Sequence, residues 1–552
     1  LRASFTPDGT TFAVVGPAPV PWQETIVRGG DDVFDATVRT AEREAVTIPF
    51  DLANGPLLRA HLVHGAGERR VLVLATHHVA CDGWSFGLLL RDLALAYEHR
   101  RLGTAVPWTP VPTMLGHARD AAPPSAAALR WWLDQYADSA PVLDLPLDAP
   151  RPRSRQFASA RCDVALDPAL IGAVRAFAAR EGTTATAVLH AAWVVLLARL
   201  AGQDDLVVGV PSAGQVSPGL ADLVGHLVAT LPVRHRLAPG ADARAVVRAV
   251  GDRLLDAFEH RDLTFGDLLA ALPMAREPGR VPLAAVLFNV DQPLTGESLG
   301  FRDLAVSVAT TPRAVDPFEL SLNVVEAHGT WRLECQYASA LFDGATIGSW
   351  LRAYGVLLDG MVRTPDVPVG LLRLADDAGL ADVRRWSVGR SLPQPVPGVL
   401  HRIAQRVAAH PDKVAVTLDG RHVSYGNLWG AAEEVGRRLR TAGVQPGDRV
   451  GVALERSPVL LAALLGAWHA GAAYVPIDLT HPLARRDLVA SDADWRAIIV
   501  DEGIDTSPTS LEHLQIALEA DLLTRSGVVA PAVPPVDPDA TAYVLYTSGS
   551  TG

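Results

Sequence analysis

One run of seven residues contains several side chains that can do acid–base chemistry: residues 77–83 read His-His-Val-Ala-Cys-Asp-Gly. An imidazole exchanges protons near neutral pH because its ordinary pKa is about 6.5. His77 and His78 supply two imidazoles, Asp82 supplies a carboxylate at a fixed offset, and Gly83 leaves the backbone open to close approach. This combination predicts a general base.

The flanking residues predict a strand before this run and a helix after it. Residues 71–76 form an apolar β run with the sequence Val-Leu-Val-Leu-Ala-Thr. After the run, large apolar side chains recur with helical spacing at Phe86, Leu89, Leu90, Leu93 and Tyr97. The histidines therefore lie in a strand-to-helix turn, where side chains can face a cleft.

Composition excludes several classes of protein. A chain of 552 residues is too long to fold around a single hydrophobic core, so two to four domains are expected. The net charge of −12 argues against nucleic-acid binding. Three separated cysteines fit neither a disulfide framework nor a metal site and favour a reducing, cytoplasmic setting. Lys413 is the only lysine, and a Walker-type phosphate loop requires a lysine, so no such loop is expected elsewhere in the chain.

No membrane segment or secretory signal is expected. The chain opens Leu-Arg-Ala-Ser-Phe, without a basic region followed by a long apolar stretch. Residues 458–477 are nearly uncharged and about long enough to span a bilayer. Their small alanines and their glycine and proline fit better with a buried helix ending near Gly471 and a following strand.

The pattern of elements divides the chain into four parts. Residues 1–155 and 156–380 mix strands and helices in a similar style, which predicts two α/β lobes with a cleft between them. Residues 381–398 contain three prolines and are interpreted as a linker. Residues 399–552 alternate helices and strands, which predicts a mainly parallel sheet. Because the chain stops inside a glycine-rich loop, we expect this last part to be a fragment.

Further motifs in residues 1–375 resemble condensation domains of nonribosomal peptide synthetases. Together with the histidine run and Trp84-Ser85, they are 131–133, 209–211, 224–228, 231–234, 260–265 and 341–343. The resemblance implies two chloramphenicol-acetyltransferase-like lobes in a V, with the histidine turn between them. It also implies upstream and downstream peptidyl carrier proteins that deliver phosphopantetheine thioesters. The acceptor's α-amine would attack the donor's thioester carbonyl and give an amide and a free thiol.

The resemblance implies a role for each residue of the turn. His78 is expected to be the base or the hydrogen-bond acceptor for the attacking amine, and His77 to orient the turn. Asp82 is expected to be an ion-pair anchor with a structural role. Gly83 lets the backbone approach the thioester and offers its N–H to the carbonyl, and Ser85 hydrogen-bonds the tetrahedral oxyanion.

Several positions depart from the family's pattern. Ala229 replaces a frequent asparagine, and Gln215 lies where many relatives carry arginine. If that arginine is the usual partner of the aspartate, Asp82 must find another partner. The strand and helix that usually open the domain are expected to be missing. The paired histidines exclude a cyclisation domain, which carries aspartates there, and the Gly-Trp-Ser continuation argues against an epimerisation domain.

Residues 399–552 resemble the beginning of an adenylation domain of the acyl-adenylate-forming superfamily. The matching motifs are 423–428, 447–452, 469–478 and 542–552. The last motif implies that Thr547, Ser548, Gly549, Ser550, Thr551 and Gly552 wrap the β- and γ-phosphates of ATP. ATP and Mg²⁺ are expected to serve the full adenylation domain only. We expect this part to form no aminoacyl-adenylate, because Lys413 is too near its start to be the catalytic lysine of the mobile lobe.

The leading hypothesis is therefore amide-bond formation between carrier-bound thioesters, with an amino-acid-activating domain behind it. One alternative is an acyltransferase that uses coenzyme A esters, and the adenylation motifs argue against it. A second alternative is a non-catalytic domain that docks carrier proteins. The intact histidine run argues against it, whereas Ala229 favours it.

Overall fold

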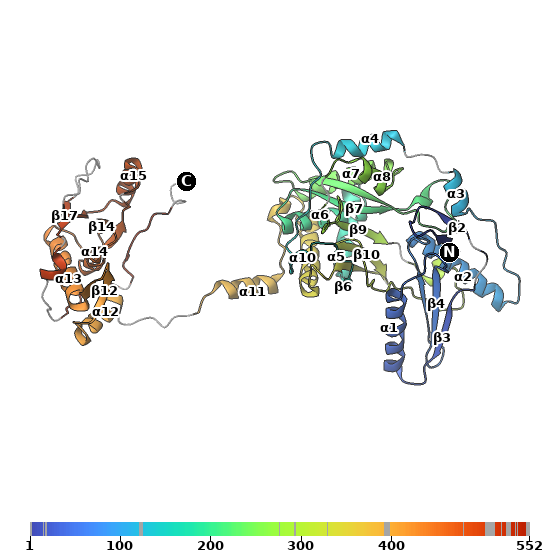
Figure 1. The fold of residues 1–552 in the computed structure, drawn as a ribbon, viewed down its shortest axis with the longest axis horizontal. Coiled ribbons are helices and arrows are strands. Elements are labelled where there is room, and N and C mark those ends of the chain that lie inside the picture. The colour runs from blue at the N-terminus through green and yellow to red at the C-terminus, as the bar shows by residue number, and fades with distance from the viewer. Residues whose placement is uncertain are drawn as a thin grey trace. The chain divides into compact units, whose positions relative to one another are not determined.

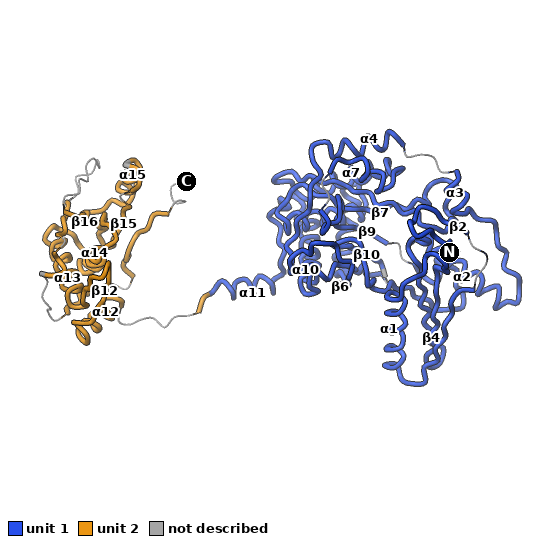
Figure 2. Tube along the Cα trace, viewed as in Figure 1, with its two compact units in different colours: residues 1–388 blue, residues 389–552 orange. Residues whose placement is uncertain are grey.

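The chain folds into two compact units, residues 1–388 and 389–552, which are described separately (Figure 2). The structure is a computed structural model. It describes residues 3–14, 16, 19–120, 125–274, 277–291, 294–327, 329–390, 398–478, 480–502, 514–519, 521–525, 531–535, 537 and 539–547.

The first unit opens with a small sheet covered by one helix. Its elements are β1 (Ala3–Phe5), β2 (Phe12–Val14), β3 (Trp22–Ile26), α1 (Asp31–Thr47), β4 (Leu58–His64) and β5 (Arg70–Thr76). The small sheet consists of three of these strands in the order β3-β4-β5. Strand β3 is parallel to β4, and β5 is antiparallel to it. Helix α1 lies alongside it (Figure 1). Phe34 and Ala41 of this helix pack against Val63 and Val73 of the sheet.

Strand β5 leads into a long helix, as the sequence predicts. Helix α2 (Gly83–Arg101) follows the histidine run, and α3 (Met114–Asp120) and α4 (Ala126–Gln135) follow α2. Asp82 caps α2 by accepting a hydrogen bond from the Ser85 backbone N–H at 2.9 Å. A side-chain oxygen at this position satisfies one of the helix's free N–H groups, so the motif aspartate fixes where the helix begins.

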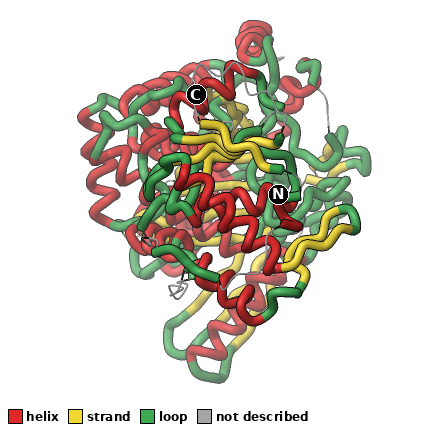
Figure 3. Tube along the Cα trace, turned by 90° about the vertical axis from the view of Figure 1, so that its left-hand side faces the viewer, coloured by secondary structure: helices red, strands yellow, loops and turns green. Residues whose placement is uncertain are grey.

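The rest of the first unit is built on a six-stranded mixed sheet with helices against it. Figure 3 shows the helices of the chain in red and its strands in yellow. The sheet order is β6-β11-β10-β9-β7-β8. Its strands are β6 (Ser159–Ala165), β7 (Asp205–Ser212), β8 (Ala229–Arg236), β9 (Val286–Asp291), β10 (Leu320–Ala327) and β11 (Thr330–Ala338). The helices are α5 (Pro168–Arg180), α6 (Ala185–Ala201), η1 (Gly214–Val216), α7 (Ala243–Glu259), α8 (Phe265–Ala271), α9 (Gly296–Leu299), α10 (Gly344–Arg363), η2 (Val369–Leu371) and α11 (Asp377–Ser387).

Helix α6 is the centre of this lobe's core. It is apolar on all sides, and each residue from 187 to 198 is buried. A helix without a polar face is stable only when it is covered all round, here by the sheet and by α5, α7 and α10.

The core extends beyond the sequence-predicted lobe boundary at residue 155. Trp132 and Tyr136, which the prediction assigns to the first lobe, are buried in the core of the second. The Trp132 indole also donates a hydrogen bond to the His260 carbonyl at 2.9 Å. A boundary argument based on the proline-rich stretch near residue 150 could not detect this long-range packing.

The predicted linker, residues 381–398, overlaps a helix. Residues 381–387 belong to helix α11, whose start at Asp377 is capped by the Asp376 carboxylate. Residues 391–397 lie outside the described part of the chain. The predicted linker therefore starts with two further turns of helix.

Two of the three cysteines meet across neighbouring strands. Cys162 in β6 lies directly opposite Cys335 in β11. Both thiols are free, and Cys81 is a third free thiol.

The second unit contains the predicted parallel sheet. All neighbours in the order β15-β14-β16-β17 are parallel, and β12 and β13 form a separate hairpin. The elements are α12 (Val399–Ala409), β12 (Val414–Leu418), β13 (Arg421–Ser424), α13 (Tyr425–Thr441), β14 (Arg449–Ala453), α14 (Pro458–His469), β15 (Ala473–Pro476), α15 (Leu483–Ala493), β16 (Ala497–Asp501), β17 (Leu514–Leu518) and α16 (Leu522–Arg525).

The apolar stretch at 458–477 is a helix followed by a strand, as interpreted from its sequence: α14 packs in the core of the second unit and β15 joins the sheet. In the part of the chain that the structure describes, no single helix is both long and apolar enough to cross a membrane. Only as a pair do helices α5 and α6 have the length and the apolar composition of a membrane span, and the two helices are bent by 107°.

Candidate active site

The first histidine of the turn holds the turn's own backbone. His77 follows β5 directly, and its Nδ1 accepts a hydrogen bond from the Val79 N–H at 3.1 Å. Its ring meets Phe50 edge-on, with 6.0 Å between ring centroids. Burial, followed by the neighbouring His78, lowers the pKa of His77, so this imidazole is neutral near pH 7. The geometry supports the predicted orienting role.

The second histidine points toward a histidine from the other lobe. His78 is exposed, and its Nδ1 lies 3.2 Å from Nδ1 of His226. The two rings are nearly perpendicular, at 89°, with centroids 4.8 Å apart. Among the described residues, Nε2 of His78 has no hydrogen-bond partner. One nitrogen of this ring is therefore held by the protein, and the other is available to a substrate.

Asp82 is bound by an amide rather than by a cation. Its side chain is 4% exposed, and it accepts hydrogen bonds from Nε2 of Gln215 at 2.9 and 3.1 Å. The backbone N–H groups of Leu227 and Ser85 donate two more, each at 2.9 Å. Burial alone would raise the pKa of Asp82, but these hydrogen bonds outweigh it and lower the pKa.

This arrangement corrects the expectation of an ion-pair anchor. Gln215 occupies the position where the resemblance predicts arginine, and it is itself the partner of Asp82. The predicted structural role of Asp82 agrees with the geometry, because the carboxylate caps α2 and ties the two lobes together.

The position of Ser85 contradicts the expected contact with an oxyanion. Its side chain is completely buried, and its hydroxyl donates to the Gly225 carbonyl at 2.8 Å. The same oxygen accepts the Gly225 N–H at 3.0 Å. A hydroxyl engaged in both directions and closed off from solvent has no capacity left for a reacting oxygen, so Ser85 joins the lobes instead.

Gly83 and Cys81 differ in what they offer to a substrate. Gly83 is exposed at the start of α2, and a Cβ built there would meet nothing within 4 Å. The space beside it is therefore not required by the protein's own packing. Cys81 is 4% exposed, and burial raises the pKa of its thiol to about 11. It is a thiol near neutral pH and a poor nucleophile.

One segment of the second lobe, residues 213–228, completes the site. Its Gly225 carbonyl also accepts the Asp82 backbone N–H at 3.2 Å. Farther along α2, the Trp84 indole donates to the Ala221 carbonyl at 2.9 Å, and Arg91 pairs with Asp222 at 2.8 Å. The segment is thus tied to the histidine turn and to α2.

Sequence reasoning missed His226 as a site residue. The residue lies in one of the motifs that carry the resemblance, but it is 148 positions from His78. Only the pairing of Gly225 and Leu227 with the turn places its ring there. A histidine within a motif from the opposite lobe was the available signal.

Most of the predicted phosphate-binding residues, 548–552, lie outside the described residues. Thr547 is described, and its carbonyl accepts a hydrogen bond from Arg485 at 3.2 Å. The segment before it pairs with β15 through the bridge between Tyr474 and Tyr543, whose rings are stacked. The segment around Tyr543 therefore lies beside the parallel sheet.

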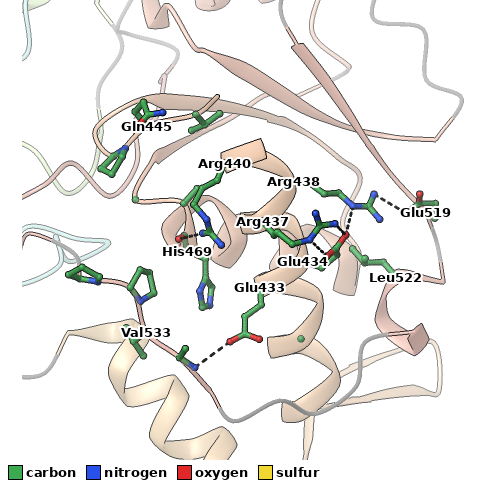
Figure 4. A pocket seen from close by; sticks show the side chains of 18 residues that line it. Glu433, Glu434, Arg437, Arg438, Arg440, Gln445, His469, Glu519, Leu522 and Val533 are labelled. Atoms are coloured by element: carbon green, nitrogen blue, oxygen red, sulfur yellow. Dashed lines mark hydrogen bonds and ion pairs between the residues drawn. The ribbon is translucent and has the colours of Figure 1, made fainter. Parts of the chain in front are cut away.

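A cavity of about 930 Å³ lies in the second unit, between α13, the end of α14 and residues 532–535 (Figure 4). Its lining includes both arginines and glutamates. The arginines are paired: Arg437 and Arg438 with Glu434, and Arg440 with the His469 carbonyl. None of the sequence-predicted site residues that the structure describes lines it. No cluster of three potential metal ligands occurs among the described residues.

Comparison with known proteins identifies two families along the chain. A family model described as a condensation domain matches residues 1–383, and one described as an AMP-binding enzyme matches residues 403–552. A probable nonribosomal peptide synthetase of Salinispora arenicola (strain CNS-205) is 32% identical over 97% of this chain. Surfactin synthase subunit 2 of Bacillus subtilis (strain 168) is 30% identical over 94%. The chain spans 7% and 15% of the lengths of these two relatives.

Solved structures show the same fold. A four-domain nonribosomal peptide synthetase, AB3403, bound to AMP and glycine matches with a TM-score of 0.70 and 22% identity, over 96% of this chain and 41% of that one. The synthetase FmoA3 bound to AMPPNP matches with a TM-score of 0.71 and 24% identity, over 99% and 58%. These matches confirm the predicted α/β fold, with two chloramphenicol-acetyltransferase-like lobes followed by an acyl-adenylate-forming domain.

Proposed function

The chain belongs to the condensation domain family of nonribosomal peptide synthetases, and we propose that its first unit joins two carrier-bound thioesters through an amide bond. The acceptor's α-amine attacks the donor's thioester carbonyl. A C–N bond forms, the C–S bond breaks, and the thiolate that leaves takes up the proton lost by the amine. Atoms and charge balance without ATP in this step.

The observation that carries the proposal is the position of His78. Its ring is exposed at the turn, with Nδ1 held by His226 and Nε2 without a partner among the described residues. Nε2 is therefore the atom that takes the proton from the attacking nitrogen and returns it to the sulfur. A positioned base of this kind typically contributes about 10²- to 10⁴-fold in rate.

The surrounding residues position this base rather than react. His77 fixes the turn through Val79, and Asp82 holds the start of α2 against Gln215 of the other lobe. The free space beside Gly83 leaves room for the donor carbonyl at the helix N-terminus, where a backbone N–H can polarise it.

Phosphopantetheine arms on upstream and downstream peptidyl carrier proteins deliver the two aminoacyl thioesters in this proposal. Tethered delivery accounts for much of the catalysis, since effective molarities for well-oriented reactants reach about 10⁵ M or more. A base is then needed only for the proton transfer.

The second unit supplies an activated amino acid in this proposal. AMP-binding enzymes of the adenylation type use ATP with Mg²⁺, and the residues expected to hold the phosphates are Thr547–Gly552. Their hydroxyl and backbone N–H groups suit an anion. Because residues 548–552 lie outside the described part of the chain, the fit rests on their composition.

The test is a reconstituted condensation. A donor carrier protein is loaded with a panel of L- and D-aminoacyl pantetheine thioesters, an acceptor carrier protein with an L-aminoacyl panel, and amide products are followed by mass spectrometry. The proposal predicts an amide on the acceptor carrier protein that requires both carriers. Product formed from coenzyme A thioesters without carriers would favour the acyltransferase alternative, and carrier binding without product would favour a docking domain.

A further inference from the structure

The contact between His78 and His226 constrains where protons lie in the site. Two imidazole nitrogens 3.2 Å apart share a single hydrogen bond, in which one Nδ1 donates and the other accepts. Two Nδ1–H groups cannot face each other at this distance. The neutral pair therefore has two arrangements, and they leave His78 with opposite chemistry at Nε2.

The arrangement that suits a base has His78 as the donor. If Nδ1 of His78 carries the hydrogen, its Nε2 has a free lone pair and can accept a proton from the attacking amine. If His226 donates instead, Nε2 of neutral His78 already carries a hydrogen and cannot act as a base. The protonated ring of His78 also donates from Nδ1, so only the first arrangement persists unchanged through proton transfer.

The environment of His226 suits an acceptor. His226 is exposed to solvent on part of its surface, and the partial desolvation of its ring, followed by the neighbouring His78, lowers its pKa, against smaller opposing effects of Asp82 and the His78 carbonyl. A neutral ring retains a lone pair for its neighbour. The other titratable groups near this contact are Asp82, which is engaged by Gln215, and His77, which is neutral and holds Val79.

The backbone around His226 is fixed on both sides, which gives the ring a defined direction. Its predecessor Gly225 is hydrogen-bonded to Ser85 and Asp82, and its successor Leu227 donates to the Asp82 carboxylate. The same carboxylate caps the helix that follows the histidine turn. One buried network therefore positions both imidazoles.

From this geometry we propose that His226 is a positioning residue that accepts the Nδ1–H of His78 and thereby keeps Nε2 of His78 free for the acceptor amine. The catalytic consequence rests on the proposed function, whereas the tautomer itself does not. His226 plays the part that a carboxylate plays beside a catalytic histidine, but without adding a charge.

The tautomer of His78 is tested by ¹⁵N NMR of the chain labelled with ¹⁵N-histidine, at a pH where His78 is neutral. The spectrum of the His78→Ala variant assigns the His78 signals. We expect His78 to be protonated at Nδ1 in the wild-type protein. His226→Phe keeps a ring of similar shape without nitrogen, and His78 should then lose this tautomer. His226→Asn offers an amide oxygen near the place of Nδ1 and should keep it. A wild-type His78 protonated at Nε2, or a tautomer unchanged by His226→Phe, would overturn the proposal.

Kinetics separates this inference from the proposed function. In the carrier-protein assay, His226→Phe should lower kcat about tenfold, equivalent to about 1.4 kcal/mol, with KM unchanged, and His226→Asn should restore most of the rate. His99→Phe, at a half-buried histidine that contacts Thr104, is the matched control and should behave as wild type. Equal kcat for wild type and His226→Phe would refute the role of His226. An unchanged rate in His78→Ala would instead refute the proposed base.

Discussion

Replacing Gln215 by leucine should weaken the junction between the two lobes. Gln215 is 1% exposed, and its amide donates to both carboxylate oxygens of Asp82 at 2.9 and 3.1 Å. Leucine has a similar size and fills the same space without a donor. The carboxylate would keep only the backbone N–H groups of Leu227 and Ser85 while it stays buried.

The magnitude follows from the burial of the acceptor. A hydrogen bond to a charged group contributes about 1.5–3 kcal/mol, and an unsatisfied buried group costs most of that amount. Because Oε1 of Gln215 is itself buried without a partner, leucine also relieves a smaller penalty. We therefore expect Gln215→Leu to lower the free energy of unfolding of the first unit by about 2 kcal/mol, a factor of about 30 in its equilibrium constant.

Urea unfolding, followed by circular dichroism and tryptophan fluorescence, measures this loss in the transition of the first unit. Gln23→Leu at an exposed position of β3 is the matched control and should change stability by less than about 0.5 kcal/mol. Gln215→Arg restores donors to Asp82 and should recover most of the loss. A Gln215→Leu protein as stable as the Gln23→Leu control would refute the inference that this amide holds Asp82 and the junction.

Three further predictions follow from the same structure. Gly83→Ala should leave the unfolding midpoint unchanged, because its Cβ meets nothing. The variant should nevertheless slow amide formation about ten- to a hundredfold, because the methyl group occupies the space beside the base. A variant whose loss of rate is matched by a loss of stability would contradict this. The buried histidines His190 and His235 contact each other, with their Nε2 atoms 3.0 Å apart. Burial, with a smaller effect of a nearby arginine, lowers the pKa of His235 to about 3, and burial also lowers the pKa of His190. The unfolded chain therefore binds protons that the folded protein does not, and stability in urea should fall as pH drops from about 6.5 toward 3, by up to about 1.4 kcal/mol per pH unit for one histidine. The double variant His190→Leu/His235→Leu should flatten this slope, and an unchanged slope would exclude the pair as its source. Gly225→Ala should impair condensation, because its Cβ would overlap the Met114 side chain. Adding Met114→Ala to this variant should restore the rate. Additive effects of the two substitutions would argue against this contact.

Local pattern was sufficient for the elements that carry the turn. The apolar run before His77 and the helical spacing after Gly83 predict β5 and α2, and the parallel sheet of the second unit follows from its alternating strands and helices. These signals are local, since each depends on the period of a single strand or helix.

Contacts between distant residues could not be predicted in the same way. The roles of Ser85 and Gln215 depend on residues 213–228 folding back onto α2, and the His78–His226 pair depends on the same closure. The sequence predicts that Ser85 contacts an oxyanion, because its position in the motif does not indicate which distant residues cover its hydroxyl. Packing across the predicted lobe boundary is long-range in the same way, as Trp132 contacts a residue that follows it by 128 positions.

The central claim is that Nε2 of His78 transfers the proton in amide formation. Single-turnover rates with preloaded donor and acceptor carrier proteins test it most directly, comparing wild type, His78→Ala and His99→Ala. We predict that His78→Ala lowers the rate by about 10²- to 10⁴-fold with carrier binding unchanged, and that His99→Ala matches wild type. A His78→Ala rate equal to that of wild type would contradict the account.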